Sequence, residues 1–174
     1  NAWIRLTICV DITTDHKLFK KYNLYGPELA KKYVLQGGAV NNQQNQITNR
    51  SGFGNDGLYN LLPNKPLGFK PIPGITSTDL SSAGKLGTLQ YATIKFICYD
   101  IEQLELMDAL YMKLGFSLVL EWGHTSFLDS DGNYSQNVIP LDVFNYTDKD
   151  NLLKAIQDKR VTHSANYDGM LGTV

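Results

Sequence analysis

The stretch ATIKFICYDIEQLELMDALYMKLGFSLVLEWG, from Ala92 to Gly123, decides the fold class, because its pattern changes from strand to helix and back to strand. Apolar residues first recur at every second position, then at helical spacing, and then alternate again. Turn and capping residues mark where each pattern stops. The sequence therefore predicts an α+β domain organised around one strand–helix–strand unit.

The first strand of this unit has one apolar face and one mixed face. The apolar face comprises Ala92, Ile94, Phe96 and Cys98. The mixed face comprises Thr93, Lys95, Tyr99 and, as an apolar exception, Ile97. We expect the apolar face to lie on the core of the domain and the mixed face to point away from it.

The helix of the unit is predicted over about 101–114. Asp100 occupies an N-cap position, and Gln103 completes the spacing of a capping box. Gly115 suits a left-handed C-cap. The predicted core stripe is Ile101, Leu104, Met107, Tyr111 and Leu114, widened by Leu106 and Leu110, and the predicted outward face is Glu102, Glu105 and Asp108.

The second strand of the unit alternates again. Phe116, Leu118, Leu120 and Trp122 share one face, and Ser117, Val119 and Glu121 share the other. Because polar residues of an alternating strand usually face solvent, Glu121 is expected to point outward.

Before this unit, the chain predicts a strand and then mostly irregular structure. Ile4, Leu6, Ile8 and Val10 alternate with polar or small residues, which favours a strand with one buried face. A short helix is predicted from Pro27 to a stop at Gly37-Gly38. Residues 39–74 are rich in Asn, Gln and Pro and predict an extended arm. Ile75 and Leu80 are expected to anchor a loosely paired strand.

After the unit, turn residues at 129–133 predict a hairpin with Asp131-Gly132 or Gly132-Asn133 at its tip. A strand-like run near 141–146 precedes a second helix near 148–159, capped by Thr147 or Asp148, and the chain then becomes extended. The predicted organisation is a strand and short helix (1–38), an arm (39–74) and a tube-like β domain (75–174) with an insertion at about 125–160. Both ends look like cuts through a longer chain.

The bulk composition excludes several classes of protein. The chain has 174 residues, 43% of them apolar, and a net charge of −1. This suffices for one domain with a core. The Lys and Arg residues do not form a basic stripe, so sequence-specific binding of nucleic acid is not predicted. The sequence also lacks an apolar run long enough for a membrane span, and it shows no signal peptide. Cys9 and Cys98 lack metal-ligand spacing; we interpret them as small buried residues in a protein that folds in a reducing cytosol, with a bridge between them left open.

Candidate metal and catalytic residues are few. His16, His124 and His163 lack the spacing of a metal site. Asp129 and Asp131 begin like a calcium loop, but Pro140 stands where the twelfth-position Glu belongs, so a solvated turn is preferred and cation binding stays open.

Glu121 could pair with Asp129 or Asp131 beside Trp122 as the acid and base of a glycosidase, but its strand position favours a routine surface carboxylate. The chain has no nucleophile elbow, phosphate loop or Cys/His signature. No catalytic, cofactor-binding or metal site is therefore predicted, and the chain is expected not to be an enzyme. Ten tyrosines, seven phenylalanines and amide-rich arms favour protein–protein contact instead.

Several blocks of the sequence resemble structural proteins of tailed bacteriophages, of the baseplate hub and tail-tube family. The blocks are WIRLT, LAKKYVLQGG, GITS, GKLGTLQYATIKFICYDIEQLELMDALYM, GFSLVLEWG and NYDGMLGTV, and LYMKLGFSLVLEWG is the most specific stretch. They are scattered over most of the chain, and none is a diagnostic motif.

This resemblance implies a β-barrel or sandwich of tube type with one helix between strands. Such domains stand side by side in a ring whose joined sheets surround a channel for DNA or an ejected protein. The expected partners are copies of the chain and other tail or baseplate proteins, in a virion assembled in the host bacterial cytoplasm. The alternatives are a carbohydrate- or receptor-binding module, with Trp122, Phe127 and Tyr134 as a stacking platform, and a cell-wall hydrolase domain that uses Glu121.

Overall fold

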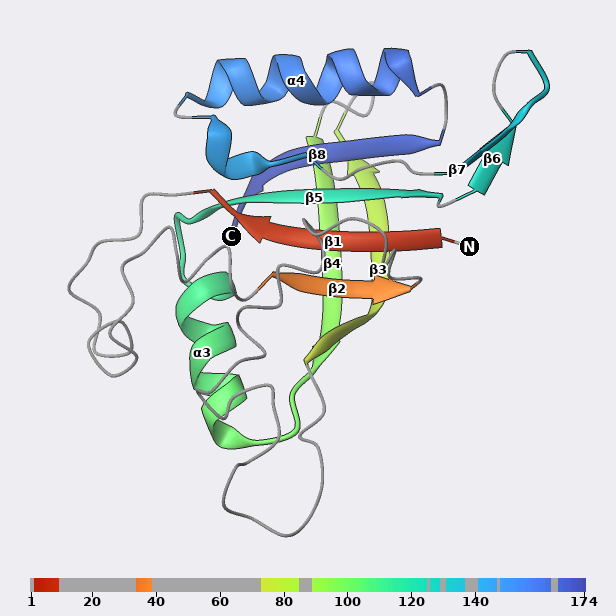
Figure 1. Cartoon of the computed structure of the whole chain (residues 1–174). Coiled ribbons are helices and arrows are strands. Elements are labelled where there is room, and N and C mark those ends of the chain that lie inside the picture. The colour runs from red at the N-terminus through yellow and green to blue at the C-terminus, as the bar shows by residue number, and fades with distance from the viewer. Residues whose placement is uncertain are drawn as a thin grey trace, which may run out of the picture.

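The computed structural model describes residues 2–9, 34–38, 73–84, 89–124, 126–128, 131–136, 141–146, 148–163 and 166–174. These segments form an α+β structure in layers (Figure 1). Helix α4 covers one face of a four-stranded sheet, and helix α3 and a two-stranded ribbon lie on the opposite side. The α+β class predicted from the sequence is confirmed, and the described strands do not close into a barrel.

The four-stranded sheet joins strands from both ends of the chain. It comprises β1 (Ala2–Ile8), β2 (Leu35–Gly38), β5 (Ser117–His124) and β8 (Tyr167–Thr173), in the order β2-β1-β5-β8. Every neighbouring pair is antiparallel. The predicted strands at β1 and β5 and the extended structure predicted at the end of the chain, now β8, are confirmed, although both faces of β1 are buried where the sequence predicted only one.

Strand β2 corrects the prediction that Gly37-Gly38 stops a helix. The start of that helix at Pro27 and most of the arm at 39–74 lie outside the described residues. A Cβ added to Gly37 would lie 2.6 Å from the backbone oxygen of Ile75, and Gly38 has a φ of 77°. The two glycines are therefore needed for close strand contact and a left-handed backbone, not for a helix C-cap.

The ribbon consists of β3 (Gly74–Ala83) and β4 (Leu89–Ile97). The two strands are paired along their whole length, with one register shift between Ile75 and Ser77, so the prediction of a loosely paired strand was wrong. Thr76 lies at this shift, and its hydroxyl donates to the Lys95 carbonyl (3.1 Å). The ribbon runs across the strands of the main sheet (Figure 1). The predicted strand–helix–strand unit is confirmed, but its two strands, β4 and β5, belong to different sheets.

Helix α3 (Ile101–Tyr111) begins at the predicted cap and ends three residues before the predicted 114. The Asp100 side chain accepts a hydrogen bond from the Gln103 amide (2.8 Å). The Gln103 side chain in turn accepts from the Tyr99 amide (2.8 Å) instead of the Asp100 amide of a standard capping box. Gly115 is left-handed as predicted, with a φ of 86°, but it lies beyond the helix end.

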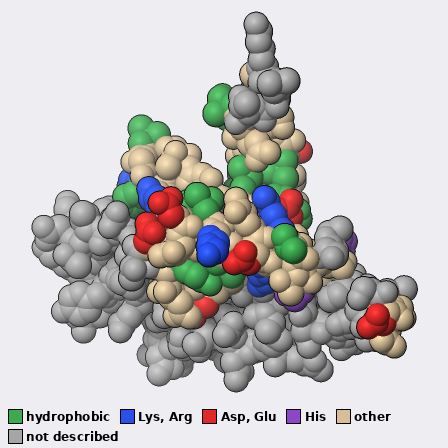
Figure 2. Space-filling model, turned by 90° about the horizontal axis from the view of Figure 1, so that it is seen from above, with side chains coloured by type: hydrophobic (Ala, Val, Ile, Leu, Met, Phe, Trp, Pro, Cys, Tyr) green, Lys and Arg blue, Asp and Glu red, His purple; other side chains and the backbone are tan. Residues whose placement is uncertain are grey.

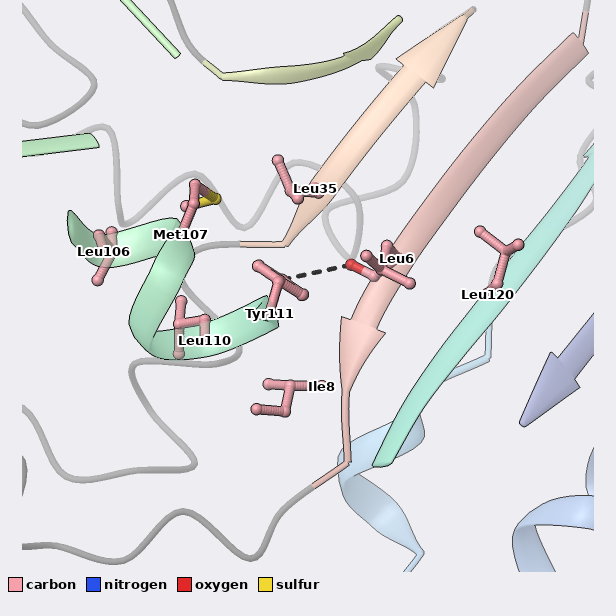
Figure 3. Close-up of a cluster of buried hydrophobic side chains, with 8 residues drawn as sticks. All are labelled: Leu6, Ile8, Leu35, Leu106, Met107, Leu110, Tyr111 and Leu120. Carbon is pink, nitrogen blue, oxygen red and sulfur yellow. Dashed lines mark hydrogen bonds between the residues drawn. The ribbon is translucent and has the colours of Figure 1, made fainter. Parts of the chain in front are cut away.

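The main core lies between α3, the ribbon and one face of the sheet (Figure 3). Its fully or almost fully buried members are Leu6, Ile8, Leu35, Leu106, Met107, Leu110, Tyr111 and Leu120. The Tyr111 hydroxyl donates to the Leu6 carbonyl across this core (3.3 Å). The predicted stripe of α3 is corrected here: Met107 and Tyr111 are buried, but Ile101, Leu104 and Leu114 are 65%, 44% and 88% exposed.

Helix α4 (Lys149–Thr162) covers the second face of the sheet. Asp148 caps it as predicted, because its side chain accepts from the Asn151 amide (3.4 Å). A short 3₁₀ helix, η3 (Val143–Asn145), replaces the strand predicted before α4. The second core is small and consists of Trp3, Val119, Val143, Leu152, Ile156 and Tyr167.

The predicted hairpin near residue 131 is confirmed. Strands β6 (Ser126–Leu128) and β7 (Tyr134–Gln136) pair antiparallel, and Gly132 has a φ of 79° in the turn between them. Positive φ is the conformation that glycine supplies in tight hairpin turns.

Candidate functional site

The sheet face under α4 contains a buried pair of opposite charges. Arg5 and Glu121 are direct partners across β1 and β5. The Arg5 Nη2 lies 3.4 Å from each oxygen of the Glu121 carboxylate. Glu121 is completely buried, so the expectation that it points outward was wrong. The reason is that α4 covers this face of the sheet, which strand alternation alone does not reveal.

Leu141, which lies two residues before η3, adds two backbone hydrogen bonds to this pair. The Leu141 amide donates to the Glu121 carboxylate (3.0 Å), and the Leu141 carbonyl accepts from the Arg5 guanidinium. Burial raises the pKa of Glu121, while the Arg5 charge, the nearby Lys159 charge and the Leu141 amide act in the opposite direction. A buried carboxylate needs such partners to stay ionised. The pair therefore connects β1, β5 and the segment before α4.

Lys159 and Tyr167 extend this polar cluster toward β8. The Lys159 ammonium lies 4.6 Å from the centre of the Tyr167 ring, a cation–π distance. Burial lowers the pKa of Lys159 to about 8, and the Glu121 charge partly opposes this shift. Burial and the Glu121 charge both raise the pKa of Tyr167. Charged and aromatic groups thus share the space between α4 and the sheet.

The lowered pKa of Lys159 predicts a dependence of stability on pH. Between about 8 and the ordinary 10.5, the folded state releases a proton that the unfolded state keeps, so the free energy of unfolding rises with pH. After allowance for partial exposure, we expect the wild type to gain about 1 kcal/mol between pH 7 and pH 10 relative to Lys159→Met. Urea denaturation at both pH values measures this change. Lys154→Met, on the exposed side of α4, is the control. The prediction would be contradicted if the wild type gained as much stability with pH relative to Lys154→Met as relative to Lys159→Met.

Among the residues that the structure describes, four buried polar atoms of this face have no hydrogen-bond partner. They are the Trp3 Nε1, the Arg5 Nε, the Thr7 Oγ1 and the Tyr167 hydroxyl. Glu121 lines neither of the two grooves described below. The arrangement suits a polar cluster that orients α4 on the sheet. Of the two carboxylates that the sequence paired with Glu121, Asp131 is exposed in the β6–β7 turn, and Asp129 lies outside the described residues.

A different surface, the outer face of β4, exposes large apolar side chains. Burial alternates along β4, so the predicted two-sided character of this strand is confirmed. The core-facing side chains are Ala92, Ile94, Phe96 and Cys98. On the other side, four large side chains are 42–52% exposed, namely Leu89, Tyr91, Ile97 and, just beyond the strand, Tyr99. We call this row, with Thr93 and Lys95 between its members, the β4 outer face.

Two apolar grooves border the ribbon. One, of about 580 Å³, lies between the end of β4 and α3 and includes Ile97, Tyr99 and Leu104 in its walls. The other, of about 320 Å³, lies between the main sheet and β3 and includes Trp3, Leu80 and Trp122. Both grooves have mainly apolar walls, which suit contact with an apolar surface or an apolar part of a ligand.

The charged surface offers no single-sign patch over α4. Figure 2 shows that acidic and basic side chains alternate with hydrophobic ones on the face that the helix presents. Such mixing gives no extended positive surface for a phosphate backbone.

The candidate histidine and aspartate residues that the structure describes lie in different places. His124 lies at the end of β5 and borders the smaller groove, whereas His163 caps the C-terminus of α4. His16 and Asp129 lie outside the described residues, and Asp131 is exposed in the β6–β7 turn. Burial lowers the pKa of His163. Across the part of the chain that the structure describes, no three His, Cys, Asp or Glu side chains form a metal-ligand cluster.

The cysteines and one aromatic candidate, Trp122, can also be placed in the structure. Cys9 and Cys98 are free and half-buried, and Cys98 shares its face with Ile94 as predicted. Burial raises the pKa of the Cys9 thiol to about 11, so this thiol is not activated. Trp122 is half-buried in the smaller groove, and the side chains of Phe127 and Tyr134 lie outside the described part.

The sequence analysis missed the residues that complete both surfaces. Arg5, Lys159 and Leu89 were not among the candidate residues predicted from the sequence. A useful signal was present in β1 and β5, where a single charge interrupts each apolar strand. Within the described segments, no helix has both the length and the apolarity of a membrane span. Comparison with protein-family models, curated proteins and solved structures finds no match to this chain.

Proposed function

We propose that this chain is a structural, non-enzymatic component of a larger assembly, of the kind found in the tail or baseplate hub of a tailed bacteriophage. The observation that carries the proposal is the β4 outer face. It exposes Leu89, Tyr91, Ile97 and Tyr99 on a ribbon whose opposite side packs on the core. A regular strand that exposes large apolar side chains at alternate positions is suited to covering by another protein surface.

The proposed neighbour is another copy of the chain or a related protein. In a ring, each subunit would cover the β4 outer face of the next through a head-to-tail contact that closes on itself. The ribbon favours this role, because it has only two strands, and the outer side chains of β4 remain exposed although its other side packs on the core. The ring would surround the tail channel and take part in assembly and genome delivery in the virion.

The near-neutral charge of the chain agrees with a channel wall. Its net charge is −1, and the face over α4 mixes both signs. A wall that carried a strong positive field would bind DNA and slow its passage. The tube-type barrel remains part of the proposal, with the described sheet and ribbon as the parts that neighbouring copies would extend.

Substitutions on the β4 outer face test the assembly role. We expect Tyr91→Ser combined with Ile97→Thr to weaken self-association at least tenfold, because both side chains would lose apolar contact with the neighbour. Sedimentation velocity over a wide concentration range measures the effect. Val161→Ser is the matched control, since Val161 is 80% exposed on α4, away from the ribbon. Equal association of the wild type and the double variant would contradict this role.

The assignment to a virion needs a separate experiment. Electron micrographs of the particle that contains this chain are expected to show several copies around the tail axis. Copies found only at the tip of a fibre, or a chain that is absent from the tail and baseplate, would overturn the assignment even if self-association were confirmed.

A receptor-binding module is the second candidate, and the smaller groove favours it. Its Trp122 and Trp3 walls and the adjacent His124 resemble an aromatic site with one polar neighbour. Binding of host surface saccharides that is lost in Trp122→Ala, with assembly unchanged in Tyr91→Ser/Ile97→Thr, would favour this candidate over the structural role.

A further inference from the structure

Among the described strands, β8 pairs only with β5, and its other edge carries no strand. The order of strands places β8 at the end of the sheet, and antiparallel pairing directs alternate residues toward β5. The His124 amide donates to the Asn166 carbonyl, and the Val174 amide donates to the Phe116 carbonyl, so even-numbered residues face β5. The backbone groups that point away from β5 are therefore those of Tyr167, Gly169, Leu171 and Thr173.

At the middle of this edge, both backbone groups of Gly169 already have partners within the chain. The Gly169 amide donates to the Asp168 carboxylate (2.8 Å), and the Gly169 carbonyl accepts from the Arg160 Nη2 (2.5 Å). The Arg160 Nε also donates to the same Asp168 oxygen. One arginine from the last turn of α4 and one carboxylate from β8 thus occupy the hydrogen-bonding groups that an added strand would need.

The two edges of the sheet are protected by different means. On the β2 side, the ribbon is in close contact, because a Cβ on Gly37 would lie 2.6 Å from the Ile75 oxygen. On the β8 side, the Arg160–Asp168 pair is 44% exposed at both side chains and covers only the Gly169 position. An exposed strand edge pairs readily with another strand unless it is blocked. The polar contacts at Gly169 are suited to such blocking.

We propose that Arg160 and Asp168 form a clip that prevents the edge of β8 from pairing with the β8 edge of a second copy of this chain. Two such edges could join antiparallel about a twofold axis, since the same outward groups occur on both. Strand addition would have to break the charge-assisted hydrogen bonds at Gly169 first. Opening of the clip makes the edge available for sheet extension. This inference does not depend on the proposed function, because it concerns a different strand.

The experiment uses a chain that already carries Tyr91→Ser and Ile97→Thr, so that association through the β4 outer face does not contribute. In this background, Arg160→Ala is expected to strengthen self-association about tenfold or more, measured by sedimentation equilibrium. Adding Thr173→Pro is expected to reverse the gain, because proline removes an outward amide of the same edge that β5 does not use. Lys154→Ala, which removes a positive charge from the exposed side of α4, should leave association unchanged.

A second variant covers the case in which Arg160→Ala fails to fold. Asp168→Asn keeps the shape of the side chain and an oxygen for the Gly169 amide but removes the charge that holds Arg160. We expect it to strengthen association several-fold, with faster hydrogen exchange at the Gly169 amide in dilute solution. The proposal is overturned if folded Arg160→Ala and Asp168→Asn associate no more strongly than their parent. It is equally overturned if the gain persists with Thr173→Pro.

Discussion

Arg5→Met is expected to destabilise the fold by about 3–5 kcal/mol, because it leaves the Glu121 carboxylate buried without its charge partner. Glu121 would keep the Leu141 amide as a donor and the Lys159 charge nearby, but these do not replace a guanidinium in direct contact. Urea denaturation at neutral pH measures the loss. A change below about 1 kcal/mol would show that the pair contributes little to the position of α4 on the sheet.

The pH dependence of this variant identifies the cause. Burial already raises the pKa of Glu121 above its ordinary 4.5, and removal of Arg5 raises it further. A carboxyl group with a raised folded-state pKa is favoured in its neutral form, so stability falls as pH rises from the unfolded pKa through the folded one. Arg5→Met should therefore lose more stability relative to the wild type at pH 8 than at pH 5.

Arg5→Met combined with Glu121→Leu is the matched control for this prediction. The double variant removes the charged carboxylate together with its partner, and replacement of a buried ion pair by apolar groups is often neutral. We expect it to recover most of the stability and to lose the extra pH dependence. If the double variant is as unstable as Arg5→Met at every pH, lost packing at position 5 and not the unpaired charge explains the effect.

Local signals in the sequence predicted the elements well where capping and periodicity agreed. Asp100 caps α3, Asp148 caps α4, and Gly132 turns the β6–β7 hairpin. Each of these depends on contacts within a few residues, which a sequence pattern can encode. The alternation of β4 was likewise visible from the sequence.

The contacts between distant segments could not be read in the same way. Arg5 and Glu121 are 116 positions apart, and nothing in the sequence sets the register that makes them neighbours. Gly37 shows the same limit, because a glycine required by the approach of Ile75 looks identical to one that ends a helix. The candidate site therefore emerged only when β1, β2, β5 and α4 were placed together.

Helix α3 shows how a correct element can have an incorrect face. The stripe predicted from spacing centred on Leu104 and Met107, whereas the buried side centres on Gln103, Leu106, Met107 and Leu110. Gln103 is fully buried because its side chain accepts from the Tyr99 amide. Gln103 therefore occupies a core position, because its side chain satisfies a backbone donor at the start of the helix. A stripe defined by apolar residues alone does not include such a position.

This difference leads to a prediction that compares a buried leucine and an exposed leucine on α3. Leu110→Ala is expected to cost about 2–5 kcal/mol of stability, because Leu110 is completely buried between α3 and the sheet, and the smaller side chain leaves a cavity (Figure 3). Leu104→Ala removes the same atoms at a position that is 44% exposed, and we expect it to cost less than about 1 kcal/mol.

Urea denaturation of both variants, with the slope of the transition compared between them, measures the two losses. The two variants should be compared at the same protein concentration, because self-association would make the apparent unfolding free energy depend on concentration. Equal losses would mean that α3 is rotated relative to the described core and that the predicted stripe through Leu104 is the buried one. A large loss of stability in Leu110→Ala alone would show that the Leu110 side of α3 packs on β1 and β5. Leu104 would then remain, with Ile97 and Tyr99, in the groove that is available to a neighbouring molecule.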